Sequence, residues 1–313
     1  MKSLRIVFMG TPEFAVESLK QLTLSSHQVV GVVTVADKPA GRGQVLQSSA
    51  VKKFAVEHNI PVMQPIRLKD PEFLNELKSF DADLFVVVAF RMLPELVWNM
   101  PPLGTINLHG SLLPAYRGAA PINWAVINGE KVTGVTTFFL QQEIDTGNVI
   151  LQTEIPIAED DTAGKLHDRM MVIGAKTLVE TVNLIAEGNA VEKPQSTLST
   201  GNMEIPIAPK IFKDDCKIDR QKNLKQIDCF VRGLSPYPAA WTTLEGKTIR
   251  VYAGLQEKFA ITGDKEWETD GKNYLKFRVA DGWYNITDLQ LEGKKRMSVE
   301  EFLRGWRPGA LTA

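Results

Sequence analysis

The first half of the chain contains apolar runs that alternate with stretches of helical periodicity. Residues 4–9, 29–35 and 84–89 are mostly apolar, and the second run is rich in β-branched residues. Phe14, Leu19 and Leu22, between the first two runs, follow a helical spacing. Buried strands that alternate with helices are typical of a largely parallel sheet with helices on both faces. The pattern predicts a doubly wound α/β fold.

The same alternation continues to residue 188. Residues 149–157 alternate between apolar and polar side chains, so an antiparallel edge strand is expected there. The other expected elements are helices at 50–58, 71–80, 120–128 and 162–187, and strands at 105–108 and 134–140.

The composition changes after residue 188. Residues 189–208 contain Pro194, Pro206 and a Ser-Thr-rich stretch, which is typical of an interdomain linker. Beyond it we expect a helix at 224–234 and strands at 240–244, 248–253, 259–262, 274–279 and 284–291. Short strands with Gly- and Asp-rich turns predict a small barrel, for which the oligonucleotide-binding (OB) type is one candidate. We therefore predict domains at 1–188 and 209–313, joined by a linker at 189–208.

The net charge of −1 hides an asymmetry between the two predicted domains. Residues 1–208 hold 17 Lys and Arg against 22 Asp and Glu, whereas residues 209–313 hold 19 against 15. A basic second half fits a polyanionic partner. A difference of this size also arises by chance, so charge alone leaves both readings open.

Several classes of ligand and location are disfavoured by the sequence. The turn Gly10-Thr11-Pro12 lacks the glycine pattern of a dinucleotide site, which argues against NAD. The four histidines and two cysteines, Cys216 and Cys229, are isolated, so no metal site is predicted and reduced thiols are expected rather than a disulfide. No signal peptide is recognised, and no apolar run approaches the about 20 residues of a membrane helix. We expect a cytoplasmic protein that does not enter a membrane.

Polar side chains gather where the strand at 105–108 ends. Asn107 and His109 are two residues apart, so on an extended segment they share a face. An amide donor beside an imidazole suits proton transfer, whereas a structural role is the simpler reading for His27, His58 and His167. Asp145 follows another strand and could fix the His109 tautomer, or could serve only its own turn.

These motifs resemble the 10-formyltetrahydrofolate-dependent formyltransferases. The segments that carry the resemblance are Asn107-x-His109-Gly110-Ser111-Leu112-Leu113-Pro114, Tyr116-Arg117-Gly118 and Asp145-Thr146-Gly147. Within that family, residues 8–15 and the basic loop 37–43 are similar to the methionyl-tRNA formyltransferases. The resemblance extends along nearly the whole chain.

The resemblance implies a fold, an activity and a set of site residues. The fold is a Rossmann-like formyltransferase domain linked to a C-terminal OB-like barrel that binds tRNA. The activity is formyl transfer from 10-formyltetrahydrofolate to the amino group of methionyl initiator tRNA, by a monomer without a metal. The implied residues are Asn107, His109 and Asp145 for catalysis, Ser111, Leu112, Leu113 and Pro114 for folate, and Lys38 and Arg42 for tRNA.

Two departures and three alternatives remain. The family's Tyr-Gly pair after the third strand is replaced around Phe90-Arg91, which puts the pterin contacts there in doubt. Residues 141–143 are also less acidic than is usual in the family. Apart from the resemblance, loop 38–42 is interpreted as a solvated surface loop, and Arg117 could meet an anion or brace its own loop. The rival functions are a nucleotide-sugar formyltransferase, a hydrolase that releases formate, and a non-enzymatic RNA-binding protein.

Overall fold

The computed structural model describes residues 2–40, 45–198, 204–258 and 265–306, and they form two compact units. The first unit comprises Met1–Gly118, Val132–Pro156 and His167–Ile207. The second comprises Ala119–Lys131, Ile157–Leu166 and Ala208–Ala313. Both units are therefore discontinuous in sequence, and the domain limits at 1–188, 189–208 and 209–313 stay a prediction.

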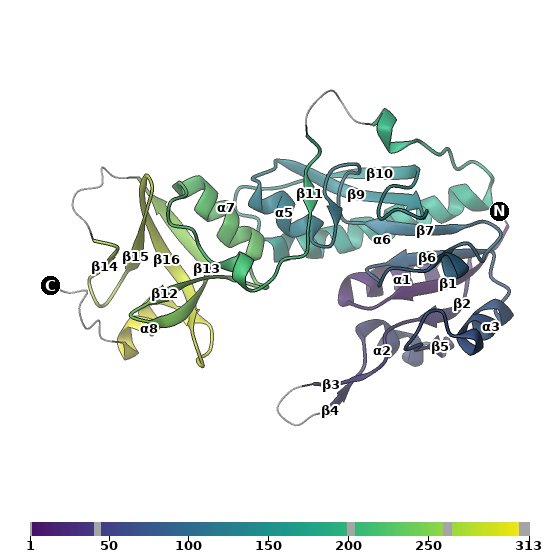
Figure 1. Ribbon diagram of the computed structural model, residues 1–313, viewed down its shortest axis with the longest axis horizontal. Coiled ribbons are helices and arrows are strands. Elements are labelled where there is room, and N and C mark those ends of the chain that lie inside the picture. Colours follow the sequence, from purple (N-terminus) through teal and green to yellow (C-terminus); the bar gives the residue numbers. More distant parts are fainter. Residues whose placement is uncertain (1, 41–44, 199–203, 259–264, 307–313) are drawn as a thin grey trace. The chain divides into compact units, whose positions relative to one another are not determined.

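A seven-stranded sheet organises the first unit, in the order β10-β9-β7-β6-β1-β2-β5 (Figure 1). Its strands are β1 (Arg5–Gly10), β2 (Gln28–Val33), β5 (Val62–Met63), β6 (Leu84–Val88), β7 (Thr105–His109), β9 (Val132–Phe139) and β10 (Val149–Pro156). The neighbouring strands β5, β2, β1, β6 and β7 pair in parallel, whereas β9 pairs antiparallel with β7 and with β10. The predicted Rossmann-like sheet and its antiparallel edge strand are confirmed.

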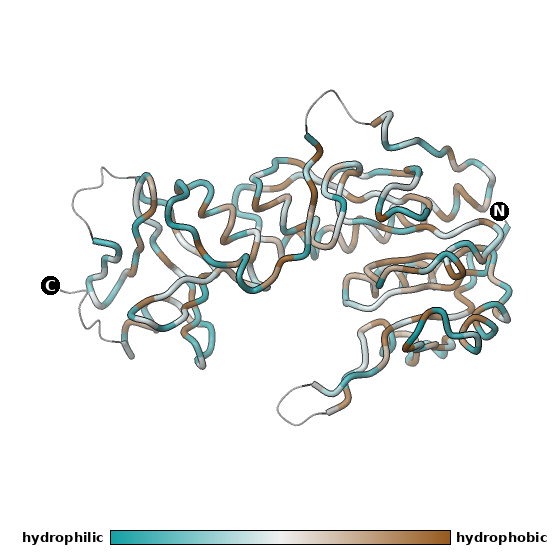
Figure 2. The backbone as a smooth tube through the Cα atoms, in the orientation of Figure 1, coloured by the Kyte–Doolittle hydropathy of each residue, from teal (hydrophilic) through white to brown (hydrophobic). Residues whose placement is uncertain are grey.

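Helices cover both faces of this sheet because successive strand residues point in opposite directions. They are α1 (Glu13–Thr23), α2 (Ala50–Glu57), α3 (Pro71–Ser79), α4 (Glu95–Trp98) and α6 (Ala163–Ala186). On one face, Val7 and Met9 share a buried cluster with Phe73 of α3. On the other face, Gly174 lets α6 approach closely, since a Cβ there would lie 3.1 Å from Leu108 Cδ2. Figure 2 shows the hydrophobic stretches of these central strands in brown.

Shorter elements carry the connections. The predicted loop after β2 contains a hairpin of β3 (Lys38–Ala40) and β4 (Val45–Gln47), which extends away from the sheet in Figure 1. Sequence periodicity did not predict this hairpin, because strands this short carry no pattern. The remaining short elements are β8 (Arg117–Gly118), β11 (Ile207–Ala208) and the 3₁₀ turns Gln195–Thr197 and Asp214–Cys216.

An antiparallel sheet in the order β12-β13-β16-β15-β14 forms the second unit, with β17 beside β16. Its elements are α5 (Pro121–Ile127), α7 (Leu224–Leu234), β12 (Ala240–Leu244), β13 (Lys247–Glu257), β14 (Trp267–Thr269), β15 (Leu275–Val279), β16 (Gly282–Leu291), β17 (Met297–Ser298) and α8 (Val299–Gly305). Irregular register at Ala253 bends β13, as bulges do. The predicted OB-like sheet is confirmed, while the strand expected at 259–262 lies outside the described residues.

One apolar core holds this second unit together. Leu224, Ile227 and Val231 line one face of α7 and join a cluster that contains Tyr284 and Phe277 of the sheet. Asn223 and Gln226 form a capping box at the start of α7, which satisfies backbone groups at that helix end. Burial raises the pKa of the Tyr284 hydroxyl, which lies near the Asp228 carboxylate.

In the part of the chain that the structure describes, no helix combines the length and apolar character that crossing a membrane requires.

Candidate active site

Asn107 and His109 both lie at the carboxyl end of β7. Strand alternation puts their side chains on the face opposite to Leu108, which packs against α6. His109 is only 7% exposed, whereas Asn107 is half-buried. The structure therefore brings the predicted amide and imidazole to one face, at the sheet edge where open α/β folds bind ligands.

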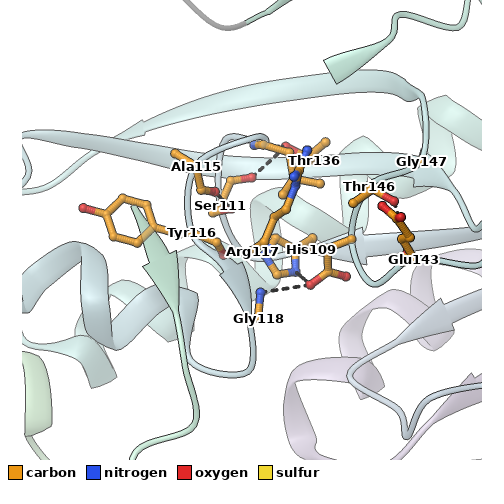
Figure 3. A network of polar contacts seen from close by, with 12 residues as sticks. His109, Ser111, Ala115, Tyr116, Arg117, Gly118, Thr136, Glu143, Thr146 and Gly147 are labelled. Carbon is orange, nitrogen blue, oxygen red and sulfur yellow. Dashed lines mark hydrogen bonds and ion pairs between the residues drawn. The ribbon is translucent and has the colours of Figure 1, made fainter. Parts of the chain in front are cut away.

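Both ring nitrogens of His109 have defined surroundings (Figure 3). Nε2 lies 2.9 Å from the carbonyl oxygen of Tyr116. A carbonyl oxygen only accepts hydrogen bonds, so Nε2 carries the proton in this contact. Nδ1 lies 3.8 Å from Asp145 Oδ2. In the neutral ring, Nδ1 is then the basic nitrogen, and once protonated it faces a carboxylate.

Asp145 occupies a constrained turn after β9. Its φ of 54° is in the left-handed region, where Asp is better tolerated than most residues. Its Oδ2 accepts a hydrogen bond of 3.0 Å from the Gly118 amide, so the carboxylate is fixed on the side that faces His109. The turn continues through Gly147, where a Cβ would lie 1.7 Å from the Phe139 carbonyl oxygen. Asp145 therefore serves its turn and also faces the imidazole.

The loop predicted to contact folate is held by hydrogen bonds to Thr136 (Figure 3). Thr136 Oγ1 donates to the Ser111 carbonyl at 2.6 Å and accepts from the Leu113 amide at 3.1 Å. The Ser111 hydroxyl is buried and donates to the Ala115 carbonyl at 2.7 Å. Leu113 is buried with Phe138 and Val149.

The neighbouring positions are less enclosed. Leu112 packs over Gly134, where a Cβ would lie 2.5 Å from Leu112 Cδ2, and both Leu112 and Pro114 are half-buried. The side chains of Ser111 and Leu113 thus contact the protein itself. The folate assignment for residues 111–114 stays a prediction.

Gln195 is a site residue that the sequence analysis missed. It is 4% exposed, and its amide nitrogen donates to the carbonyl oxygens of Asp145 at 2.8 Å and Gly147 at 2.9 Å. Its amide oxygen accepts two bonds from the Arg117 guanidinium. Arg117 therefore braces the site through Gln195. A glutamine inside a segment typical of a linker carries no signal by itself.

Of the two predicted tRNA-binding residues, the structure places Lys38 on the β3–β4 hairpin. Lys38 is exposed at the start of β3, and Arg42 lies outside the described residues. Asp37, the residue before Lys38, anchors the hairpin. Its carboxylate accepts hydrogen bonds from Lys52 at 2.6 Å and from Gln64 at 2.8 Å. The hydrogen bonds from Lys52 and then Gln64 lower the pKa of the Asp37 carboxyl.

The segment that departs from the family pattern is held by its arginine. Arg91 donates to the carbonyls of Pro65 and Ile66, and its guanidinium lies over the Phe90 ring. Burial lowers the pKa of Arg91. This contact fixes the segment after β6 against the one that follows β5.

Across residues 2–40, 45–198, 204–258 and 265–306, no group of three or more His, Cys, Asp or Glu side chains is arranged to hold a metal ion. Cys216 and Cys229 are buried, and neither forms a disulfide.

Known structures share this fold at low sequence identity. WlaRD, a sugar 3N-formyl transferase crystallised with dTDP and 5-N-formyl-THF, matches with a TM-score of 0.66 and 21% identity, over 94% of this chain and 100% of that one. HypX from Aquifex aeolicus, crystallised with tetrahydrofolic acid, matches with a TM-score of 0.63 and 18% identity, over 96% of this chain and 47% of that one.

Sequence comparisons are more specific. Residues 4–182 match the formyl transferase family, and residues 210–307 match the formyl transferase C-terminal domain. The methionyl-tRNA formyltransferase of Bacteroides fragilis is 52% identical over 97% of this chain and 96% of its own length. That of Parabacteroides distasonis is 53% identical over 98% and 97%. This chain therefore belongs to the methionyl-tRNA formyltransferase family.

Proposed function

We propose that the protein transfers the formyl group of 10-formyltetrahydrofolate to the α-amino group of methionyl initiator tRNA. The observation that carries the proposal is the His109–Asp145 pair beside Asn107, at the strand end of a chain about half identical to methionyl-tRNA formyltransferases. The folates in the WlaRD and HypX crystals support a folate as the formyl donor.

His109 acts as the proton carrier in this proposal. A free α-amino group has a pKa of about 7.7–8.0, so much of it is protonated near neutral pH and has to lose a proton to attack. The solvent takes that first proton, and Nδ1 of neutral His109 takes a second one from the neutral amine as its nitrogen bonds to the formyl carbon. The new imidazolium faces Asp145 at 3.8 Å, and the carboxylate stabilises it.

Asn107 stabilises the charge that develops on the formyl oxygen. Its amide donates a hydrogen bond to that oxyanion, and one such donor contributes about 3–4 kcal/mol to the transition state. The intermediate then breaks its bond to the folate nitrogen, which leaves with the electron pair and receives a proton from His109. The products are tetrahydrofolate and N-formylmethionyl-tRNA, and the enzyme forms no covalent bond to the formyl group.

The substrates occupy separate parts of the chain in this proposal. The folate lies along residues 111–114, and the tRNA contacts Lys38 and Arg42 together with the basic residues 209–313. An exposed lysine on a hairpin anchored at Asp37 suits a contact with phosphates. The protein acts as a monomer in the cytoplasm.

A competition assay tests the proposal. The purified protein receives 10-formyltetrahydrofolate with methionyl initiator tRNA and a UDP-amino sugar together, and mass spectrometry follows both formylated products and free formate. We expect formylmethionyl-tRNA as the dominant product. A formylated sugar would assign the chain to nucleotide sugars, formate without an acceptor product would indicate a hydrolase, and no turnover would leave only an RNA-binding role.

A further inference from the structure

We infer that Gln195 is a positioning residue that holds Asp145 in place against His109, an inference that rests on the proposed function. Gln195 contacts neither side chain of the pair. It binds instead the backbone of the Asp145 turn and the side chain of Arg117. The contacts link the segment that holds the imidazole to the turn that holds the carboxylate.

The Gln195 amide uses all of its hydrogen-bonding capacity in this link. Its two N–H groups donate to the Asp145 and Gly147 carbonyls, and its oxygen accepts from Arg117 Nε at 3.0 Å and Nη2 at 2.6 Å. The opposite orientation would put the NH₂ group against the guanidinium and the oxygen against two carbonyls. The network therefore allows one orientation of this amide. The charge of Arg117 also polarises the amide and strengthens its donors.

The two ends of the link, Arg117 and the Asp145 turn, are next to the catalytic pair in the chain or contain part of it. Arg117 follows Tyr116, whose carbonyl oxygen binds His109 Nε2. It precedes Gly118, whose amide donates to Asp145 Oδ2. The Gln195 side chain holds the other side of the Asp145 turn, because it donates to the backbone carbonyl of Asp145. A shift of this turn would therefore change the 3.8 Å separation between Nδ1 and Oδ2.

Gln195 is itself fixed to the sheet. Lys193 exchanges two backbone hydrogen bonds with Val149 at the start of β10, at 2.8 and 2.9 Å. Pro194 then restricts the backbone before Gln195. The backbone before Gln195 is thus fixed to the sheet, while the Gln195 side chain binds the Asp145 turn. This arrangement suits a residue that holds Asp145 in the left-handed conformation, which L-residues disfavour.

The test replaces Gln195 by methionine, which has similar length but forms no hydrogen bonds of this kind. We expect Gln195→Met to lower kcat for formylation by about ten- to hundredfold, because misplacement by about 1 Å costs up to about a hundredfold. KM for folate and tRNA should stay within about twofold. Gln21→Met is the matched control, since it removes a glutamine contact on α1, with Glu17, and should leave kcat unchanged.

A double-mutant cycle separates positioning from general destabilisation. If Gln195 acts through Asp145, adding Gln195→Met to an Asp145→Asn variant should lower kcat by less than about twofold further. The full loss repeated in that background, or a wild-type kcat in the single variant, would overturn the inference. Gln195→Glu keeps the size and the bond to Arg117 but removes the donors, so it tests the same contacts if the methionine variant fails to fold.

An activity-independent measurement distinguishes this inference from the proposed function. The ¹⁵N NMR resonance of His109 Nδ1, assigned with His109→Ala, should shift in Gln195→Met and stay in place in Gln21→Met. An unchanged resonance would overturn the positioning role even in an active enzyme. If the wild type transferred no formyl group to tRNA while Gln195→Met still shifted the resonance, the proposed function would be refuted and the positioning role would be kept.

Discussion

The loops around His109 and the β3–β4 hairpin differ in how their polar side chains are held. His109, Asp145 and Gln195 are mostly buried, and their contacts fix one another's orientation. Lys38 on the hairpin is exposed, and the residue that anchors this region is its neighbour Asp37. Both regions follow strands of the same sheet, so the difference comes from side-chain partners rather than from their place in the fold.

This difference suits two different functions, proton transfer in the first region and contact with a polyanion in the second. Proton transfer requires groups within hydrogen-bond reach, which buried contacts maintain. Contact with a polyanion requires charges that remain available to the partner, and it tolerates a less rigid geometry. We therefore expect substitutions at the first region to change kcat and substitutions at the second to change kcat/KM for the tRNA.

The largest effect is expected at Asn107. Asn107→Ala should lower kcat by at least about a hundredfold, with tRNA affinity nearly unchanged, because one oxyanion donor contributes that much. Steady-state kinetics with both substrates measure the effect, and Asn99→Ala, at an exposed helix end, is the control. Turnover within a few-fold of the wild type would remove Asn107 from the mechanism.

Asp145→Asn should be as damaging as the loss of His109. An amide at this position cannot stabilise an imidazolium at Nδ1, and its NH₂ group would donate to Nδ1 and occupy the lone pair that has to accept the proton. The measurement is kcat across a pH series, together with thermal unfolding to check the fold. A pH–rate profile identical to that of the wild type would show that Asp145 is only a turn residue.

Arg42→Ala tests the second region. We expect a lower kcat/KM on charged initiator tRNA. The loss should correspond to about 1–3 kcal/mol of transition-state stabilisation, which is the contribution of one bidentate arginine contact. Arg42→Lys should restore little, because it keeps the charge but loses the fork. The dissociation constant of a folate analogue should not change. A weaker folate analogue with normal tRNA kinetics would place this loop at the folate site instead.

The smallest effect is expected at Asp270, which belongs to the second unit and to neither of these two regions. Asp270 accepts backbone hydrogen bonds from Asn273, Lys272 and Tyr274, and these bonds, that from Asn273 foremost, hold the pKa of its carboxyl well below the usual range. Asp270→Ala should lower the free energy of unfolding by about 1 kcal/mol near neutral pH, since the turn is exposed.

The pH dependence of this effect follows from the direction of the shift. A carboxyl whose pKa is lower in the folded state stabilises the fold fully above its unfolded pKa of about 3.9, and less as the pH falls toward the folded value. The difference between Asp270→Ala and the wild type should therefore shrink in acid, as denaturant unfolding at several pH values would show. A difference that grows in acid, or a change in formyl transfer, would contradict this assignment.

The sequence predicted the larger elements because their signals are local. The apolar run at 84–89 became β6, and the periodic stretch at 162–187 became α6. The β3–β4 hairpin and β17 were not predicted, since strands of two or three residues have no periodicity. The expected strand at 259–262 lies outside the described residues.

The candidate site was predictable only in part. The spacing of Asn107 and His109 indicated a shared face, because strand alternation follows directly from sequence. Gln195 contacts the Asp145 turn across 50 residues of chain, and no pattern in the sequence announces such a contact. The role of Arg117 was left open for the same reason, since its partner was unknown.

The most direct measurement is the single-turnover rate of formyl transfer to methionyl initiator tRNA, with 10-formyltetrahydrofolate and enzyme both saturating. Under these conditions the rate reports the chemical step rather than binding. We expect the wild type and His58→Ala, a variant of an exposed histidine, to react alike, and His109→Ala to be at least about a hundredfold slower. Equal rates for His109→Ala and the wild type would contradict this expectation.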